Sequence, residues 1–176
     1  MVRRKGSTIR GRSAKKKGSR AEINVRNQLR SIYPVELRDN VNRVPLSGAG
    51  AMKSDVMDNN DPMSCYEVKC QETLHLPDWW RQTKRQAKPS RNPILVFTQA
   101  YRPFYYTLLK GDWEELVGKS LYAGVVAYVE YNSPKNMMDR LGKEPERTCV
   151  RITLDDDECV IVKSDFYLEV KKDLLK

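Results

Sequence analysis

The sequence lacks several features that would assign the protein to a familiar class. It has no run of about 18 apolar residues, which a membrane-spanning helix needs, and its basic N-terminus has no apolar segment of the kind found in secretory signals. It has one histidine, His75, and its four cysteines (Cys65, Cys70, Cys149 and Cys159) form no CxxC pair. A zinc site and a disulfide framework are therefore not indicated, and we expect reduced thiols in a cytoplasmic protein.

Acidic residues are missing from the first 20 positions. Residues 1–20 hold nine Lys and Arg, which equals the net charge of +9 of the whole 176-residue chain, so the remaining 23 Lys/Arg and 23 Asp/Glu balance. We expect residues 1–17 to form a disordered arm that binds a polyanion, although a solubility tail or a localisation signal has the same composition. Its candidate DNA contacts are Arg10, Arg12, Lys15, Lys16, Lys17 and Arg20.

A short hairpin carries the most informative residues. Asp55–Met57 and Cys65–Cys70 have the composition of strands, and the residues between them, 58–62, favour a turn. A hairpin centred near Asp61 places Asp55 opposite Glu67, with Cβ atoms about 4.5–5.5 Å apart. Because side chains alternate along a strand, Lys69 shares the face of Glu67.

Two carboxylates and an ammonium at one place favour metal-assisted hydrolysis. A hard cation such as Mg²⁺ removes the repulsion between neighbouring carboxylates, lowers the pKa of a bound water and neutralises charge on a phosphate. Lys69 is suited to orienting that water or stabilising the transition state. The alternative is a surface hairpin with an ordinary Glu/Lys pair, which spacing alone does not exclude.

The first helix and the loop after it offer further candidates. Ser19 and Glu22 have capping-box spacing, followed by an apolar repeat that ends at Pro34. Glu22 is therefore either a helix cap or a third carboxylate for the metal. Strand segments are expected at 35–37 and 43–46, leading to the small residues 47–51, which either approach a ligand closely or form a plain loop.

The rest of the chain predicts a mixed α/β domain. Residues 76–87 should form a helix on which Gln82 either points back to the site or lies on the surface, while Lys84 and Arg85 are candidate phosphate contacts. Residues 94–98 should form a central buried strand. Beyond residue 110 we expect a short helix from Asp112, a strand within 121–131, some helix at 136–141, a hairpin through the acidic turn 155–158, and a last helix capped by Ser164.

Residues 18–109 resemble the archaeal-type Holliday-junction resolvases and their phage relatives, in the PD-(D/E)xK nuclease superfamily. The resemblance lies in Gly18–Glu22, Ser47-Gly48, Asp55 and Glu67-Val68-Lys69, in this order and spacing. It departs from the motif at Ser54, where proline is common, and does not extend beyond about residue 110. It implies a restriction-endonuclease-like αβββαβ core (18–110) with a mixed central sheet flanked by helices, and leaves 111–176 as a C-terminal β-hairpin/helix extension of the same domain.

The resemblance also implies a function and a set of roles. It implies an Mg²⁺-dependent endonuclease, with Mn²⁺ as a possible substitute, that resolves four-way DNA junctions as a homodimer during recombination and repair. It implies that Asp55, Glu67, the Val68 carbonyl and Glu22 bind the metal, and that Lys69 and Ser47 assist catalysis. Gln82 is a further catalytic candidate from its position on the helix, and Gly48, in the same loop as Ser47, is a candidate DNA contact. Trp79, Trp80, Tyr105 and Tyr106 are candidates for a dimer face or for the core. A nuclease of the same superfamily that acts on linear or flapped DNA, and a non-catalytic nucleic-acid-binding protein, are the alternatives.

Overall fold

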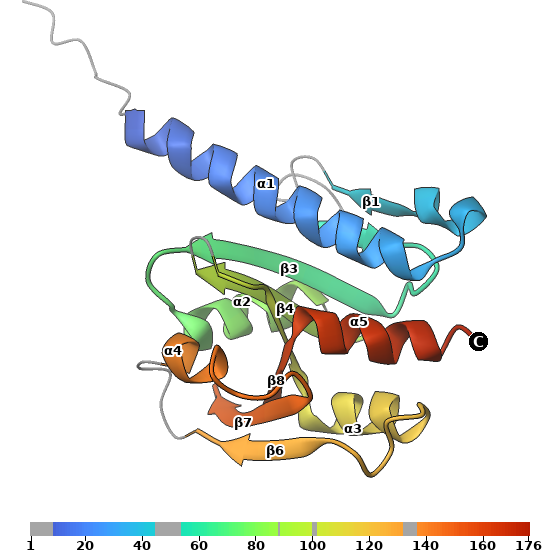
Figure 1. Cartoon of the computed structure of the whole chain (residues 1–176). Coiled ribbons are helices and arrows are strands. Elements are labelled where there is room, and N and C mark those ends of the chain that lie inside the picture. The colour runs from blue at the N-terminus through green and yellow to red at the C-terminus, as the bar shows by residue number, and fades with distance from the viewer. Residues whose placement is uncertain (1–8, 45–53, 88, 100–101, 132–136) are drawn as a thin grey trace, which may run out of the picture.

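The computed structural model describes residues 9–44, 54–87, 89–99, 102–131 and 137–176 (Figure 1). No described helix combines the length and apolar composition needed to cross a lipid bilayer. The elements are α1 (Ile9–Ile32), the 3₁₀ helix η1 (Val35–Asn40), β1 (Val41–Arg43), β2 (Val56–Asp58), β3 (Ser64–Gln71), α2 (Leu76–Ala87), β4 (Asn92–Gln99), β5 (Tyr105–Leu109), α3 (Lys110–Gly118), β6 (Ala127–Glu130), α4 (Met137–Leu141), β7 (Thr148–Leu154), β8 (Asp157–Lys163) and α5 (Ser164–Asp173).

The strands form one mixed sheet, in the order β1-β2-β3-β4-β5-β8-β7-β6. β3 runs parallel to β4 and β6 runs parallel to β7, whereas the other neighbours are antiparallel. The first part of the chain follows the expected αβββαβ order, which confirms the restriction-endonuclease-like fold class. The expected C-terminal hairpin is β7–β8. It continues the same sheet, because β8 pairs with β5 along the whole length of β5.

Helices cover both faces of this sheet, and alternation along the central strands explains the two cores. On one face, α1 packs on β3, while α3 and α5 pack on β5 and β8, and their shared core includes Tyr66 and Val68 of β3 and Ile94 and Val96 of β4. On the other face, α2 packs on Leu95 and Phe97 of β4 and on β7 and β8. In Figure 1, α1 and α5 lie in front of the sheet and α2 lies behind it. Neighbouring residues of β3 therefore face different helices.

The first helix is longer than the sequence pattern predicts. The expectation of a cap at Ser19 is wrong, because α1 begins at Ile9 and includes residues 9–17, which we expected in a disordered arm. Gly18 costs an interior helical position about 1 kcal/mol relative to alanine, but Ala14 and the Lys/Arg run around it are good helix formers. Glu22 therefore lies well inside the helix and is not its cap. Figure 1 shows the N-terminal end of α1 extending beyond the sheet.

Three further local expectations are corrected. Residues 35–37 lie in η1 and form no strand. The strand expected within 121–131 is limited to β6, since 121–125 are in turns. Ser164 is the first residue of α5, and the position before it, Lys163, makes no side-chain capping bond. By contrast, the helix at 76–87 and the buried strand around 94–98 are confirmed.

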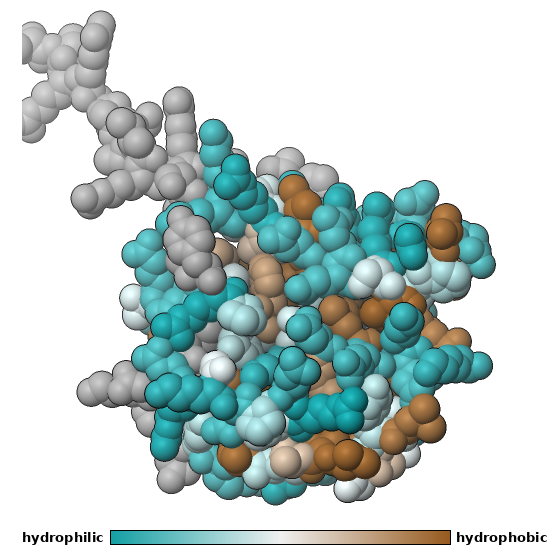
Figure 2. Space-filling model, in the orientation of Figure 1, coloured by the Kyte–Doolittle hydropathy of each residue, from teal (hydrophilic) through white to brown (hydrophobic). Residues whose placement is uncertain are grey.

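The four aromatic residues considered for a dimer face belong to the core. Trp79 is 5% exposed, and Trp80, Tyr105 and Tyr106 are at most 1% exposed. Tyr106 stacks on Tyr167 of α5 with ring centroids 4.2 Å apart. These side chains are therefore not available to a partner. Apolar surface residues lie elsewhere, in η1 and in the segment after α3, and Figure 2 shows one exposed face of the molecule as mostly hydrophilic with scattered apolar patches.

Candidate active site

The predicted hairpin forms between β2 and β3. Val56 pairs with Tyr66, and this register places Asp55, the residue before β2, opposite Glu67. The Asp55 N–H donates to the Tyr66 carbonyl (2.9 Å), and the Val68 N–H donates to Asp55 Oδ2 (2.9 Å). Asp55 is thus fixed against β3 both by its backbone and by its carboxylate, beside Glu67.

Ser54 fixes the start of β2 against β3, although it departs from the proline of the motif. Its side chain is 1% exposed. Its Oγ lies 2.6 Å from the Val56 carbonyl and 3.0 Å from the Tyr66 carbonyl, so one hydroxyl bridges the two strands. Local sequence patterns alone suggest no role for Ser54. The signal that could have suggested one is its position, since a residue in place of the rigid proline must fix the same turn by other means.

Glu67 is the most perturbed group of the site. It is 2% exposed. Burial, together with the neighbouring Asp55 carboxylate, raises its pKa from 4.5 to about 7, and Lys69 opposes the rise. Near neutral pH this carboxyl is therefore poised between its protonated and ionised forms. Such a shift, produced mainly by burial and reinforced by a neighbouring carboxylate, is characteristic of functional sites.

The two oxygens of Glu67 differ in their surroundings. Oε1 accepts from Lys69 Nζ (2.6 Å) and from Gln82 Nε2 (2.9 Å), which α2 presents to this face. Oε2 is buried and has no hydrogen-bond partner among the described protein atoms. Of the two positions considered for Gln82, the structure has the one beside Glu67. A buried carboxylate oxygen without a partner is costly, and a cation is the partner that would satisfy it.

The oxygen donors of this site, chiefly the two carboxylates, are suited to a hard divalent cation. Asp55 and Glu67 offer oxygen ligands on one side of the hairpin, which are the ligands that Mg²⁺ prefers. The described residues contain no group of three or more His, Cys, Asp or Glu side chains placed to hold a metal. A carbonyl such as that of Val68, and water, must then complete the coordination.

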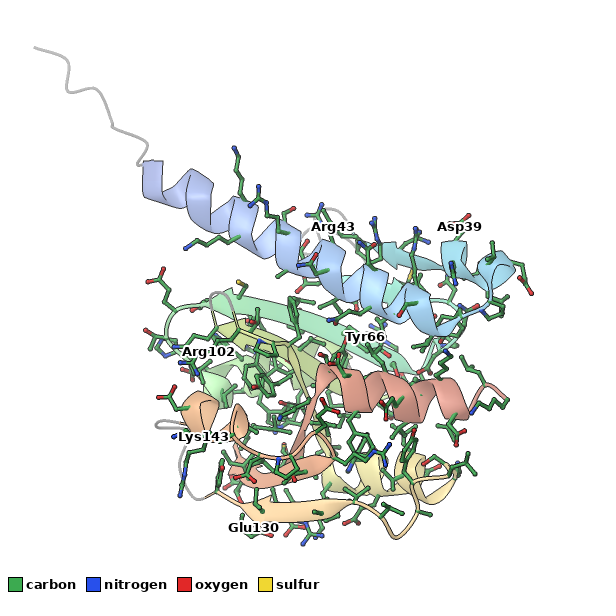
Figure 3. All side chains as sticks on the ribbon, viewed as in Figure 1. Asp39, Arg43, Tyr66, Arg102, Glu130 and Lys143 are labelled. Carbon is green, nitrogen blue, oxygen red and sulfur yellow. The ribbon has the colours of Figure 1, made fainter. Side chains whose placement is uncertain are left out.

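Glu22, expected as a third carboxylate, is engaged elsewhere. Its Oε2 is bonded to Arg43 Nε, and both side chains are partly buried. Arg43 pairs with Val56, so by alternation it points to the α1 face, whereas Asp55 and Glu67 point to the α2 face. The structure therefore does not bring Glu22 into the carboxylate pair. Arg43 was missed by the sequence analysis, because only the tertiary packing of α1 on β1 reveals its partner (Figure 3).

The remaining candidates fall into three groups. Ser47 and Gly48 lie outside the described residues, and for Arg10, Arg12 and Lys15 only the helical backbone is described. Lys16 and Arg20 lie on α1, where Lys17 forms an ion pair with Glu72, just after β3 (3.2 Å). Arg85 is exposed, whereas Lys84 forms ion pairs with Asp155 and Asp157 at the β7–β8 turn. The acidic cluster 155–158 therefore includes a turn, as its sequence favoured.

Among the comparisons with known proteins, a family model gives a match. The family described as phage putative PDDEXK endonuclease matches residues 13–149, which is more than half of the chain and extends beyond the region of resemblance recognised in the sequence. Neither the curated proteins nor the solved structures give a significant match. The matched range includes both carboxylates, Lys69 and Gln82. The chain therefore belongs to the phage putative PDDEXK endonuclease family.

Proposed function

We propose that this protein is a divalent-metal-dependent DNA endonuclease that hydrolyses phosphodiester bonds at the site formed by Asp55, Glu67, Lys69 and Gln82. The single observation that carries the proposal is Glu67 itself: a buried carboxylate beside a second carboxylate, with one oxygen held by Lys69 and Gln82 and the other without a protein partner. A purely structural Glu/Lys pair would not need the second carboxylate, which raises the free energy of the ionised site.

The cofactor that this donor set suits is Mg²⁺, with Mn²⁺ as a substitute. Asp55, Glu67 and the Val68 carbonyl would hold it, and when bound it supplies Lewis-acid stabilisation of the phosphate and a water of lowered pKa. The Val68 N–H fixes the Asp55 carboxylate through Oδ2. The Asp55 carboxylate is thereby oriented by the backbone of β3, and that of Glu67 by Lys69 and Gln82, before any substrate arrives.

Lys69 and Gln82 act on the same carboxylate. The Lys69 ammonium, 2.6 Å from Glu67, favours the ionised form that a metal requires and opposes the effect of burial. Its positive charge is also placed to stabilise negative charge that develops on a phosphate in the transition state. The Gln82 amide fixes the orientation of Glu67, leaving Oε2 directed away from both donors.

DNA is inferred as the substrate from the positive charge of α1 and from the resemblance to junction resolvases. Basic residues in the first half of α1 favour the phosphate backbone of DNA, and the Lys17–Glu72 ion pair fastens this helix beside the segment that follows β3. We propose the four-way junction as the preferred substrate, on the resemblance to junction resolvases. Paired cuts on strands related by a two-fold axis would then require two copies of the chain.

The test is cleavage of a labelled four-way junction and of a linear duplex of the same arm sequence. Reactions with Mg²⁺ or with EDTA should be compared for the wild type and for Lys69→Met. Paired nicks in the junction, absent with EDTA and with Lys69→Met, support the proposal in full. Equal rates on the linear duplex retain the nuclease and reject the junction preference. Tight DNA binding without cleavage under any metal condition rejects the nuclease.

A further inference from the structure

We propose that the turn between β7 and β8 positions Gln82 at the active site by fixing the rotation of α2. The inference rests on the proposed function, and it gives a role to the chain after residue 110. The turn consists of Asp155 and Asp156, which join the paired residues Leu154 and Asp157. Both have positive φ (51° and 68°), as in the two-residue type I′ hairpin turn. This tight turn fixes the directions of the neighbouring carboxylates.

Two of these carboxylates hold α2 by one flank. Asp157 Oδ2 accepts from the indole Nε1 of Trp80 (2.8 Å) and lies 2.6 Å from Lys84 Nζ. Asp155 binds Arg81 through Nε (3.1 Å) and Nη2 (3.0 Å), and also lies 3.1 Å from Lys84 Nζ. We call these contacts between Asp155, Asp157 and the three α2 residues the α2 clamp. Trp80 is fully buried, so the clamp includes a core side chain as well as surface ions.

Gln82 lies on the other flank of the same helix. At 3.6 residues per turn, Trp80, Arg81 and Lys84 fall within about 100° of one another, and Gln82 lies about 150° from their mean direction. The apolar face that packs on the sheet separates the two flanks. A rotation of α2 about its axis is therefore resisted by the clamp on one side, and would withdraw the Gln82 amide from Glu67 on the other.

Only a small movement is needed to lose this contact. The Gln82 Nε2 to Glu67 Oε1 distance is 2.9 Å, and a displacement of about 1 Å breaks the hydrogen bond. A misplacement of that size in a catalytic group costs up to about a hundredfold in rate. Asp157 therefore acts as a positioning residue, through Trp80 and the helix, on the carboxylate that we assign to the metal.

The experiment compares two variants that open the clamp with a matched control. Asp157→Ala removes both contacts of that carboxylate, and Trp80→Phe removes the indole N–H while keeping an aromatic ring in the core. Asp156→Asn is the control, because Asp156 lies in the same turn, is exposed, and makes no hydrogen bond or ion pair with the described residues of α2; asparagine tolerates its positive φ. Thermal denaturation of each variant gives its folded fraction, to which kcat is normalised.

For Asp157→Ala and Trp80→Phe we expect kcat to fall about tenfold to a hundredfold with KM for DNA within twofold, and for Asp156→Asn we expect no change in either. Gln82→Ala and the double variant Gln82→Ala/Asp157→Ala should have equal kcat, because the clamp acts through Gln82. Additive losses in the double variant, or an unchanged kcat in both opened variants, overturn the proposal.

A measurement without catalysis separates this proposal from the nuclease assignment. The side-chain amide resonance of Gln82, identified by its loss in Gln82→Ala, should move to the position of a solvent-exposed glutamine in Asp157→Ala and Trp80→Phe, and stay in place in Asp156→Asn. An unmoved resonance in both opened variants overturns the clamp. If the wild type cuts no DNA, the proposed function fails, while this resonance still decides whether the turn holds Gln82.

Discussion

Replacing Glu67 with glutamine should change how the stability of the metal-free protein depends on pH. The folded protein holds the pKa of this carboxyl at about 7, against an ordinary value of 4.5. Between these values the folded state keeps a proton that the unfolded chain has released, so the free energy of unfolding falls as the pH rises. At 1.36 kcal/mol per pH unit, this shift corresponds to roughly 3 kcal/mol of the free energy of unfolding, which is present in full below pH 4.5 and lost above pH 7.

Urea denaturation in EDTA at pH 5 and pH 8 measures this contribution. Two-state linkage with these pKa values gives a loss of roughly 2–3 kcal/mol between the two pH values for the wild type, beyond any loss shown by Glu67→Gln. The glutamine variant retains every other titrating group, including His75, so the difference isolates Glu67. The side chain is only 3% exposed, and solvent screening therefore reduces the effect little. Parallel pH profiles for the two proteins would refute the raised pKa of Glu67, and with it the buried position beside Asp55 that causes it.

Three other perturbations have expected outcomes. Lys69→Met should reduce kcat by at least about a hundredfold while leaving DNA affinity nearly unchanged, and an equal loss in filter-binding affinity would contradict a transition-state role. Leu29→Ala, at a fully buried position of α1, should lower the free energy of unfolding by about 2–5 kcal/mol, whereas an unchanged urea midpoint would mean that α1 does not pack on the sheet. Removal of residues 1–17 should flatten the dependence of DNA affinity on salt while preserving kcat at saturating DNA, and an unchanged slope would remove the basic segment from DNA binding.

The part of the site that sequence reasoning predicted is the part that depends on short-range rules. The alternation of side chains along two short strands, and the position of the turn between them, sufficed to place Asp55 opposite Glu67. Helical spacing made Gln82 a candidate for the same face but left a surface position open, and in the structure its amide contacts Glu67. Both relations involve fewer than 20 residues, and the intervening backbone leaves few alternatives.

The features that were not predicted depend on contacts between distant segments. Glu22 binds Arg43 because α1 packs across β1, and nothing in the local sequence of either residue indicates that pairing. The start of α1 was misplaced because a Lys/Arg-rich segment is compatible with a helix as well as with disorder. Likewise, the acidic turn after β7 was correctly expected to be a turn, but its contacts with α2 follow from the sheet order.

The order of the sheet also explains why the C-terminal third is not an appendage. β8 lies between β5 and β7, so it completes the hydrogen bonding of a strand in the nuclease core. α5 then covers the same face as α1, where Tyr167 bonds to Tyr66 across 3.1 Å between their hydroxyls. Removing residues after 110 would expose both the edge of β5 and this buried face.

The most direct test of the central claim is a crystal soaked with Mn²⁺ and measured at a wavelength that gives anomalous scattering from manganese. The account predicts one strong anomalous peak in contact with carboxylate oxygens of both Asp55 and Glu67, on the side of Glu67 Oε2. The same peak should be absent from Glu67→Gln crystals treated identically. A peak that contacts Glu22 and neither of these residues, or no peak at a Mn²⁺ concentration that supports cleavage, would contradict it.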